Sequence, residues 1–383
     1  MSSSRLNWNQ ATNPLAQALA SKRAAGASLL DLCESNPTRA RLRYPAGLLD
    51  DLSNPDGLLY QPDPRGLESA RMAVTGHYRE RGVDLPTSRI LLTASTSEAY
   101  SYLFNVLADP GDEILSPRPS YPLFEFLAGL CSVKIRQYPL RYDGAWHIDF
   151  RALDAAITPR TRAVVIVNPN NPTGSFLKAP ELEELEAVAL RRGLAIISDE
   201  VFCDYSFDPM AQCVKTLAGD RRVLTFSMSG LSKIAGLPQL KLGWIVASGP
   251  GHEQALDALD LVADTYLSVS TPVQVALPQL LRAGPAIRNA ISERIKANLA
   301  TLRATLEGSP AGVLTVEGGW YGVLQVPRTQ SEEAWVLRLL EEQNVHVQPG
   351  FYFDFETEAF LVVSLLTPEL VFAEGLRRLR AFL

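Results

Sequence analysis

The sequence predicts an α/β protein in which a large lobe contains a mostly parallel sheet and a smaller lobe has an α+β arrangement. Three observations support this prediction: a chain of 383 residues, a hydrophobic share of 46%, and apolar runs that alternate with helical patterns from about residue 89 to residue 248. At about 100–200 residues per domain, this length suggests two or three domains. Apolar runs without polar alternation are typical of parallel strands that are covered on both faces.

Seven runs rich in valine, isoleucine and leucine are the expected strands of the large lobe. In chain order they are Ile90–Thr93, Glu113–Ser116, Lys134–Leu140, Ala163–Asn168, Ala195–Asp199, Val223–Ser227 and Leu242–Ala247. The clearest helix between them begins at Ala179-Pro180, where proline and glutamates suit a first turn, and ends at Gly193. Strands that alternate with helices in this order indicate an α/β domain with right-handed crossovers.

The pattern changes towards the C-terminus. A long helical pattern runs from about Val273 to Leu306, and we expect a break in it around Gly284-Pro285. Two strand-like segments and two helices follow, at Gly319–Val326, Phe360–Leu365, 331–343 and 368–382.

The first 45 residues contain a helix and an extended segment, too little to fold alone, so we expect them to dock on the C-terminal lobe. The sequence thus predicts a large domain at 46–275 and a small domain formed by residues 1–45 and 276–383.

Composition excludes several classes of protein. The net charge is −6 and no block of lysine and arginine is longer than a pair, so nucleic acid is not an expected partner. No apolar stretch approaches the roughly 20 residues that span a bilayer. The polar start of the sequence lacks the apolar region of a signal peptide. We therefore expect a cytoplasmic protein without a membrane partner.

Cysteines and histidines are scattered. Cys33, Cys131, Cys203 and Cys213 form no C-x-x-C pair and are expected to be buried, reduced thiols. The four histidines are isolated in the sequence, so no metal site is expected. The motifs G-x-S-x-G, G-x-G-x-x-G and G-K-[ST] are also missing, which argues against the serine hydrolases, dinucleotide dehydrogenases and P-loop NTPases that carry them.

Three polar segments follow neighbouring predicted strands. Asn168–Gly174 ends one strand, Asp199 ends the next, and Lys233 follows the third. Taken singly they fit an Asn/Pro/Gly turn, a helix cap and a surface lysine. Because groups beyond the carboxyl ends of parallel strands converge on one crevice, we expect an amide, a carboxylate and an amine to meet there. Pyridoxal phosphate requires this set: an amine to form the aldimine, a carboxylate for the ring nitrogen, and an amide for the ring hydroxyl.

Longer motifs surround these residues. N-P-x-N-P-T-G at 168–174 precedes S-D-E-V at 198–201 and S-x-x-S-K-x-x-G-L-P-x-x-K-x-G-W at 229–244. This order resembles that of the class I/II aminotransferases, which are pyridoxal phosphate enzymes of fold type I. The resemblance implies that Tyr60 reaches the phosphate of the partner subunit's cofactor and that Tyr121 stacks on the cofactor ring. The other cofactor-binding residues that it implies are Ser95, Thr96, Ser97, Asn171, Asp199, Ser232, Lys233 and Lys241.

The sequence departs from the family pattern at three positions. Phe202 replaces a tyrosine that donates to the ring hydroxyl, and Tyr205 is the candidate substitute. Lys241 replaces an arginine, as in the kynurenine aminotransferase-like branch. Val362 occupies the place of the arginine that binds the substrate carboxylate. Arg39 is our candidate replacement, because it follows Asn36 in a segment that lines the substrate pocket in this family.

The predicted function is that of a pyridoxal phosphate-dependent aminotransferase (EC 2.6.1.-). It would move an amino group between an amino acid and a 2-oxo acid through a Lys233 aldimine. The resemblance also implies a homodimer with shared active sites. Another reaction on the same scaffold, by a carbon–sulfur β-lyase or a decarboxylase, stays open. A regulator that senses the cofactor is disfavoured, because it needs a DNA-binding domain and the chain has no basic patch.

Overall fold

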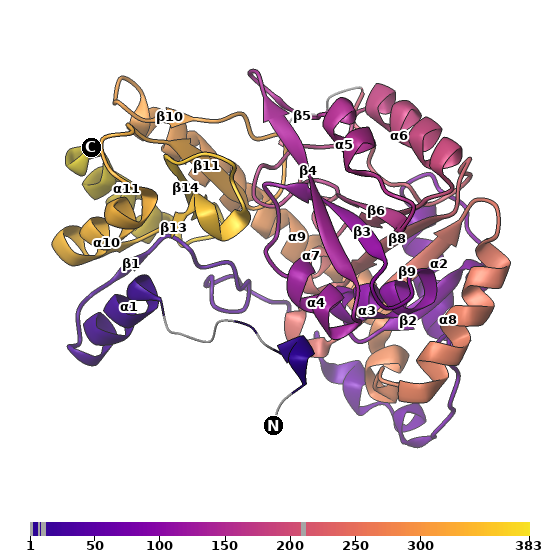
Figure 1. Cartoon of the computed structure of the whole chain (residues 1–383). Helices are drawn as coiled ribbons and strands as arrows, with labels where there is room; N and C mark the ends of the chain where they lie inside the picture. Colours follow the sequence, from indigo (N-terminus) through magenta and orange to yellow (C-terminus); the bar gives the residue numbers. More distant parts are fainter. Residues whose placement is uncertain (1–2, 7, 9–12, 208–211) are drawn as a thin grey trace.

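A computed structural model describes residues 3–6, 8, 13–207 and 212–383 (Figure 1). Its centre is an eight-stranded sheet with the order β2-β9-β8-β7-β6-β3-β4-β5. The strands are β2 (Ile90–Thr93), β3 (Glu113–Arg118), β4 (Lys134–Tyr142), β5 (Trp146–Ile148), β6 (Thr161–Val167), β7 (Ala195–Asp199), β8 (Thr225–Gly230) and β9 (Gly243–Ser248).

The sheet is mostly parallel, as predicted. The pairs β4–β3, β3–β6, β6–β7 and β7–β8 are parallel, whereas β9 is antiparallel to both of its neighbours. All seven predicted strands are present, but the number seven is one too low, because β5 adds an antiparallel edge strand to β4. This strand has only three residues and follows a turn at Gly144, which has a φ of 107°. Such a short run carries no periodic signal in the sequence.

Helices cover both faces of this sheet. They are α2 (Glu68–Arg79), α3 (Thr96–Leu107), α4 (Phe124–Leu130), α5 (Phe150–Ala156), α6 (Ala179–Arg192), α7 (Leu231–Ile234) and α8 (His252–Tyr266). Consecutive residues of β6 point into two different cores. Val165 packs with side chains of α3 and α8, and Val164 packs with side chains of α5 and α6. Burial on both faces explains why the strands are apolar without alternation.

Helix α9 (Thr271–Leu306) corrects the predicted break at Gly284-Pro285, because it is continuous over 36 residues. Its buried face includes Leu280, Gly284 and Ile287. A Cβ at Gly284 would lie 3.5 Å from the Cβ of Ala235, so the helix lies close to α7 at this point. Interior glycine and proline cost a helix about 1 and 3 kcal/mol, and packing along both halves of α9 compensates for them.

The C-terminal part contains a four-stranded sheet with the order β10-β11-β14-β13. Its elements are β10 (Gly312–Val313), β11 (Tyr321–Gln325), β13 (Gln348–Pro349), β14 (Phe360–Ser364), α10 (Glu332–Gln343) and α11 (Glu369–Phe382). Short 3-10 helices occupy Ser4–Leu6, Asp50–Ser53, Pro55–Leu58, Thr87–Arg89, Pro238–Leu240 and Gly350–Phe353. None of the helices in the described ranges has an apolar stretch long enough to cross a membrane.

The N-terminal segment contacts this C-terminal part. Helix α1 (Pro14–Ala24) lies against α10, and β1 (Leu30–Asp31) pairs in parallel with β12 (Val345–His346). Figure 1 shows α1, in indigo, below the orange and yellow elements of the smaller lobe. Chain segments from both ends therefore lie side by side, while the exact division at residues 45 and 275 stays a prediction.

Candidate active site

The loops that follow β3, β6, β7 and β8 leave the carboxyl edge of the sheet next to one another. In the strand register, Val167 of β6 pairs with Asp199 of β7, and Asp199 pairs with Met228 of β8. Asn171 and Lys233 follow these strands by only a few residues. Because parallel neighbours end on the same side, this edge collects the polar side chains predicted from the sequence.

Asp199 is a buried carboxylate, with a relative exposure of 8%. Its Oδ2 accepts a hydrogen bond from the Tyr100 hydroxyl at 3.1 Å, and its Oδ1 accepts one from the Val201 N–H at 3.2 Å. Burial raises the pKa of Asp199 from 3.8 to about 6, although both hydrogen bonds and the positive charge of Lys233 oppose that rise. At neutral pH this group is therefore largely an ionised carboxylate, and a further positive charge beside it would be stabilised.

Lys233 lies in the single helical turn α7, directly after β8. Burial lowers the pKa of its amine from 10.5 to about 8, and the negative charge of Asp199 limits the decrease. The Nζ atom lies 4.7 Å from the ring centre of Trp320 and 5.4 Å from that of Phe202. The half-buried amine therefore lies against two aromatic rings, and with a pKa of about 8 part of it is neutral and nucleophilic at pH 7–8.

Tyr205 forms a hydrogen bond with the backbone of the lysine turn. Its hydroxyl donates to the carbonyl oxygen of Lys233 at 2.5 Å, and its ring packs edge-on against Trp320. A tyrosine hydroxyl has one proton to donate, so Tyr205 anchors the lysine turn and does not replace the hydroxyl that is missing at Phe202.

Asn170 ties the loop after β6 to the loop after β3. The Ser120 hydroxyl donates to Asn170 Oδ1 at 3.0 Å, and Asn170 Nδ2 donates to the Pro119 carbonyl at 3.0 Å. These bonds link the neighbours of Asn171 and Tyr121. Asn171 itself is buried, and its Oδ1 has no hydrogen-bond partner among the described residues. Such an orphaned buried acceptor is typical of a site that a ligand completes.

Gly174 closes the same loop. It has a φ of +71°, and a Cβ at this position would lie 2.5 Å from the carbonyl oxygen of Gly318. The Gly318 N–H donates to the Gly174 carbonyl at 2.9 Å. Only glycine combines a positive φ with the lack of a Cβ, so this position requires glycine. As the final residue of the N-P-x-N-P-T-G motif, Gly174 holds the loop against the segment that leads to Trp320.

The N-terminus of α3 offers an anion site. Ser95 caps the helix by accepting the Glu98 N–H at 3.2 Å, and Thr96 and Ser97 form the half-buried first turn. N–H groups in a first turn have no acceptor within the helix, and the helix dipole adds positive potential. Ser232 is half-buried beside Lys233, whereas Lys241 is exposed and has a φ of 50°.

Two predicted site residues lie apart from this group. Tyr60 is 72% exposed and lines a hollow together with Tyr102, Ser268 and Gln274. Its place on the surface of its own chain is compatible with a role in a second copy. The Arg39 side chain is 76% exposed, and its Nε lies 4.0 Å from Glu34 Oε2.

Asn36, the other predicted substrate contact, organises its own turn. Its Oδ1 accepts hydrogen bonds from the N–H and the hydroxyl of Thr38, at 3.0 and 2.8 Å. Val362 is fully buried in an apolar cluster that includes Trp146 and Phe353. The position of the family arginine is therefore filled by a side chain that packs in a core.

Sequence reasoning missed Tyr100 and Trp320. Tyr100 lies one helical turn after Thr96, on the face of α3 that packs on the sheet, and this spacing was a usable signal. Trp320 follows Gly318-Gly319 and is fully buried. Nothing near Trp320 in the sequence indicates that it contacts Lys233, which is more than 80 residues earlier in the chain.

Comparisons with known proteins identify the family of the chain. Residues 29–373 match the family described as aminotransferase class I and II. Human tyrosine aminotransferase is 30% identical over 335 residues, which are 83% of this chain and 71% of that protein. Glutamate-pyruvate aminotransferase AlaA of Escherichia coli is 34% identical over 223 residues, 57% of this chain and 55% of that protein.

Solved structures show the same architecture. An alanine aminotransferase from Pyrococcus furiosus superimposes with a TM-score of 0.90 at 25% identity, covering 100% of this chain and 99% of that one. An aminotransferase from Escherichia coli gives a TM-score of 0.88 at 26% identity, covering 100% and 98%. By its matched residues, its fold and its relatives, the chain belongs to the class I and II aminotransferases, which depend on pyridoxal phosphate.

Proposed function

We propose that Lys233 and Asp199 form the catalytic centre through which this enzyme moves an amino group between an amino acid and a 2-oxo acid. One observation carries the proposal: the half-buried amine of Lys233 lies against the rings of Trp320 and Phe202 at the sheet edge where the Asp199 carboxylate is buried, and the pKa values of the two groups are about 8 and about 6. Neither group has its ordinary pKa, because burial disfavours both charges. Paired titratable groups shifted in this way are typical of catalytic sites.

The residues at this edge fit pyridoxal phosphate. Asp199 offers a negative charge to a protonated ring nitrogen, the amide oxygen of Asn171 has no partner in the part of the chain that the structure describes, and the α3 N-terminus suits a phosphate. When bound, the cofactor supplies an electron sink that stabilises negative charge on the donor's α-carbon. The residues that would hold it are Ser95, Thr96, Ser97, Tyr121, Asn171, Asp199, Ser232, Lys233 and Lys241, together with Tyr60 of a second copy.

Lys233 would both carry the cofactor and move the proton at the α-carbon. An amine with a pKa near 8 gains and loses a proton easily at neutral pH, which both tasks require. The rings of Trp320 and Phe202 lie against this amine and shield part of it from solvent. Tyr205 keeps the backbone of the lysine turn in place.

Replacement of Lys233 tests this assignment. Lys233→Ala should lose the visible absorbance that arises when the cofactor is attached to a lysine, and turnover with it. Lys296→Ala, in which an exposed lysine of α9 is removed, is the matched control and should keep both. Retained absorbance in Lys233→Ala would assign the attachment to another lysine.

A second copy of the chain would complete each site. The segment at Leu58–Tyr60 supports this, because Leu58 is 90% exposed and Tyr60 is also largely exposed. Mixing two inactive variants, Tyr60→Ala and Lys233→Ala, tests it directly. If Tyr60 serves the partner's cofactor, each mixed dimer contains one intact site and regains activity; if it serves its own chain, no mixed dimer does.

Arg39 would bind the donor carboxylate in place of the arginine that Val362 replaces. The guanidinium is exposed and Glu34 is its neighbour at 4.0 Å, so a substrate carboxylate can compete for it. The alternative is a donor without an α-carboxylate. Comparing amino acids with the matching amines, by the change in the cofactor spectrum, distinguishes the two.

Amino-group transfer itself is separable from β-elimination and decarboxylation. A transferase needs a 2-oxo acid for every turnover and follows ping-pong kinetics, whereas a lyase or decarboxylase turns over without one. Relatives named tyrosine, glutamate-pyruvate and alanine aminotransferases favour transfer, with an amino acid as donor. A cytoplasmic location stays a prediction.

A further inference from the structure

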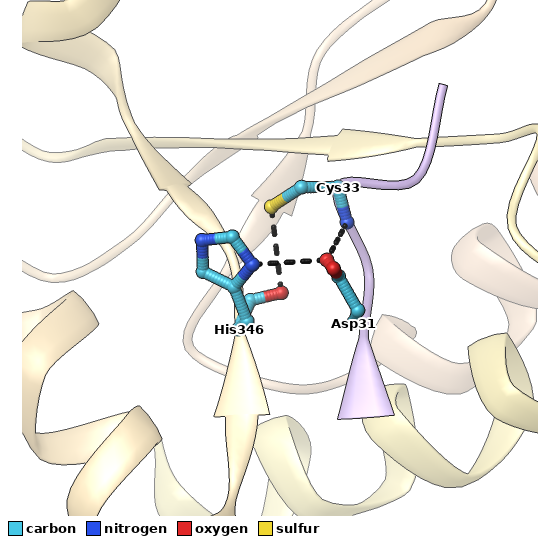
Figure 2. Close-up of side chains that lie close together, drawn as sticks. All are labelled: Asp31, Cys33 and His346. Atoms are coloured by element: carbon cyan, nitrogen blue, oxygen red, sulfur yellow. Dashed lines mark hydrogen bonds and ion pairs between the residues drawn. The ribbon is translucent and has the colours of Figure 1, made fainter. Parts of the chain in front are cut away.

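Three side chains with metal-binding atoms lie together where β1 pairs with β12 (Figure 2). Asp31 ends β1 and pairs in register with His346 of β12, and Cys33 follows two residues later. The Leu32 side chain between them is fully buried, and its Cδ atoms lie near Gly375 of α11. The chain turns at Leu32 and Cys33 directly after β1, and Figure 2 shows the side chains of Asp31 and Cys33 on the side of His346.

The three donor atoms already lie close to one another. One Asp31 oxygen, the Cys33 sulfur and one His346 nitrogen all lie within 4.8 Å of each other. His346 Nδ1 is 2.9 Å from Asp31 Oδ1, and the same oxygen accepts the Cys33 N–H at 2.9 Å. The cluster is therefore held in place by backbone pairing and hydrogen bonds before any ligand arrives.

We propose that Asp31, Cys33 and His346 bind one thiophilic divalent cation of the Zn²⁺ class, with water as a fourth ligand. A mixed set of sulfur, imidazole nitrogen and carboxylate oxygen suits Zn²⁺, whereas Mg²⁺ and Ca²⁺ prefer oxygen alone. Three protein ligands plus water is a common arrangement for zinc. The site is independent of the cofactor site, because it uses none of the residues assigned there.

A nucleophilic role for Cys33 fits less well. The thiol donates to the His346 backbone carbonyl at 3.5 Å and not to the imidazole ring. Burial and the charges of Asp31 and Glu34 raise the pKa of the Cys33 thiol well above its ordinary value. A bound cation reverses this effect, because its charge stabilises the thiolate and the proton passes to solvent.

Access and competition are also compatible with an ion. The His346 side chain is 12% exposed and that of Asp31 is 37% exposed, so the carboxylate side of the cluster opens to solvent. The competing cation is Arg23, whose Nη2 is 3.8 Å from Asp31 Oδ2. That distance leaves the Arg23–Asp31 pair weak, and Oδ1 faces His346.

An ion here would fasten the N-terminal segment to the C-terminal lobe. Leu32 and Glu34 already accept hydrogen bonds at their carbonyls from the N–H and the hydroxyl of Ser364, both at 2.7 Å. The segment then continues to Asn36 and Arg39. A ligand that binds the folded chain stabilises it, so added Zn²⁺ should raise the melting temperature.

Equilibrium dialysis of the chelator-treated holoenzyme against Zn²⁺ tests the proposal. We expect one Zn²⁺ per chain, and affinity reduced about 10- to 100-fold or more in Cys33→Ser and His346→Gln. The matched controls are Cys131→Ser and His147→Gln, since Cys131 is another free cysteine and His147 forms an exposed pair with Asp143 at 3.5 Å. Both controls should bind as the wild type does.

X-ray absorption of the wild-type enzyme provides a test that needs no variant. The zinc spectrum should show one sulfur at about 2.3 Å and nitrogen or oxygen at about 2.0–2.2 Å. A spectrum without sulfur, no stoichiometric Zn²⁺, or undiminished binding in a folded Cys33→Ser protein would each overturn the proposal.

Discussion

Replacing Asp199 by asparagine should stabilise the cofactor-free protein while it disables the enzyme. A carboxyl whose pKa is raised on folding holds its proton more tightly in the folded state. The associated stability is complete below the unfolded pKa of 3.8 and is lost as the pH rises through about 6. At about 1.4 kcal/mol per pH unit, the ionised form of Asp199 costs roughly 3 kcal/mol above that pH.

The corresponding change in melting temperature follows from the size of the chain. Unfolding entropy near 2.1 cal/mol/K per residue gives about 0.8 kcal/mol/K for 383 residues, so roughly 3 kcal/mol corresponds to about 4 °C. The pKa of about 6 already includes the attraction to Lys233, but the asparagine amide places new N–H donors in the buried site, and any donor without a partner offsets part of this gain. We therefore expect Asp199→Asn to raise the melting temperature by about 1–4 °C at pH 8, and by about half as much at pH 5.

Thermal unfolding of the cofactor-free protein at the two pH values is the assay, and a second scan with pyridoxal phosphate adds the functional test. Bound cofactor should stabilise the wild type more than Asp199→Asn, because the variant has no carboxylate for the ring nitrogen. Asp154→Asn, which removes an exposed acid paired with Arg192 at 2.9 Å, should show no such gain. A lower melting temperature for Asp199→Asn at pH 8, or equal stabilisation of both proteins by cofactor, would refute the reasoning.

Three further changes probe the surroundings of this centre. Tyr100→Phe removes a hydrogen bond to a charged group, which is worth about 1.5–3 kcal/mol, so the pKa of Asp199 should rise and the acid limb of the kcat/KM profile should move up by about one to two pH units; an unmoved limb would exclude Asp199 as the titrating group. Arg39→Ala should raise KM for the amino donor at least tenfold while cofactor affinity, measured by fluorescence titration, stays unchanged; an unchanged KM would remove Arg39 from the substrate site. Gly174→Ala should lower the free energy of unfolding by about 1–3 kcal/mol or more and reduce cofactor binding. Gly193 has a similar φ but open space around it, so Gly193→Ala should lose only the free energy that the backbone strain costs. Equal losses of the two variants in urea unfolding would show that the contact with Gly318 is unimportant.

Local patterns in the sequence were sufficient for seven of the eight strands of the large sheet and for the placement of the central residues. Strands of the parallel sheet are apolar runs bounded by turns, so their positions are visible without the fold. Once they are known, the parallel arrangement itself places Asn171, Asp199 and Lys233 on one edge. The motif order then indicated the family, which the comparisons confirm.

Other features could not be predicted, because they depend on contacts between distant segments. Cys33 and His346 are 313 residues apart, and only the pairing of β1 with β12 makes them neighbours. The hydrogen-bond partner of the Tyr205 hydroxyl likewise depends on which elements pack around it. The same is true of the apolar cluster that surrounds Val362.

The sequence by itself therefore determined which elements form and which side chains the sheet collects at its edge. The tertiary structure decided how strongly each of these side chains is perturbed. The pKa of Asp199 illustrates the difference, since it results from burial by the sheet, a hydroxyl from α3 and the charge of Lys233. Periodicity is a property of a few neighbouring residues, whereas desolvation and electrostatic potential at a buried site are sums over every segment that surrounds it.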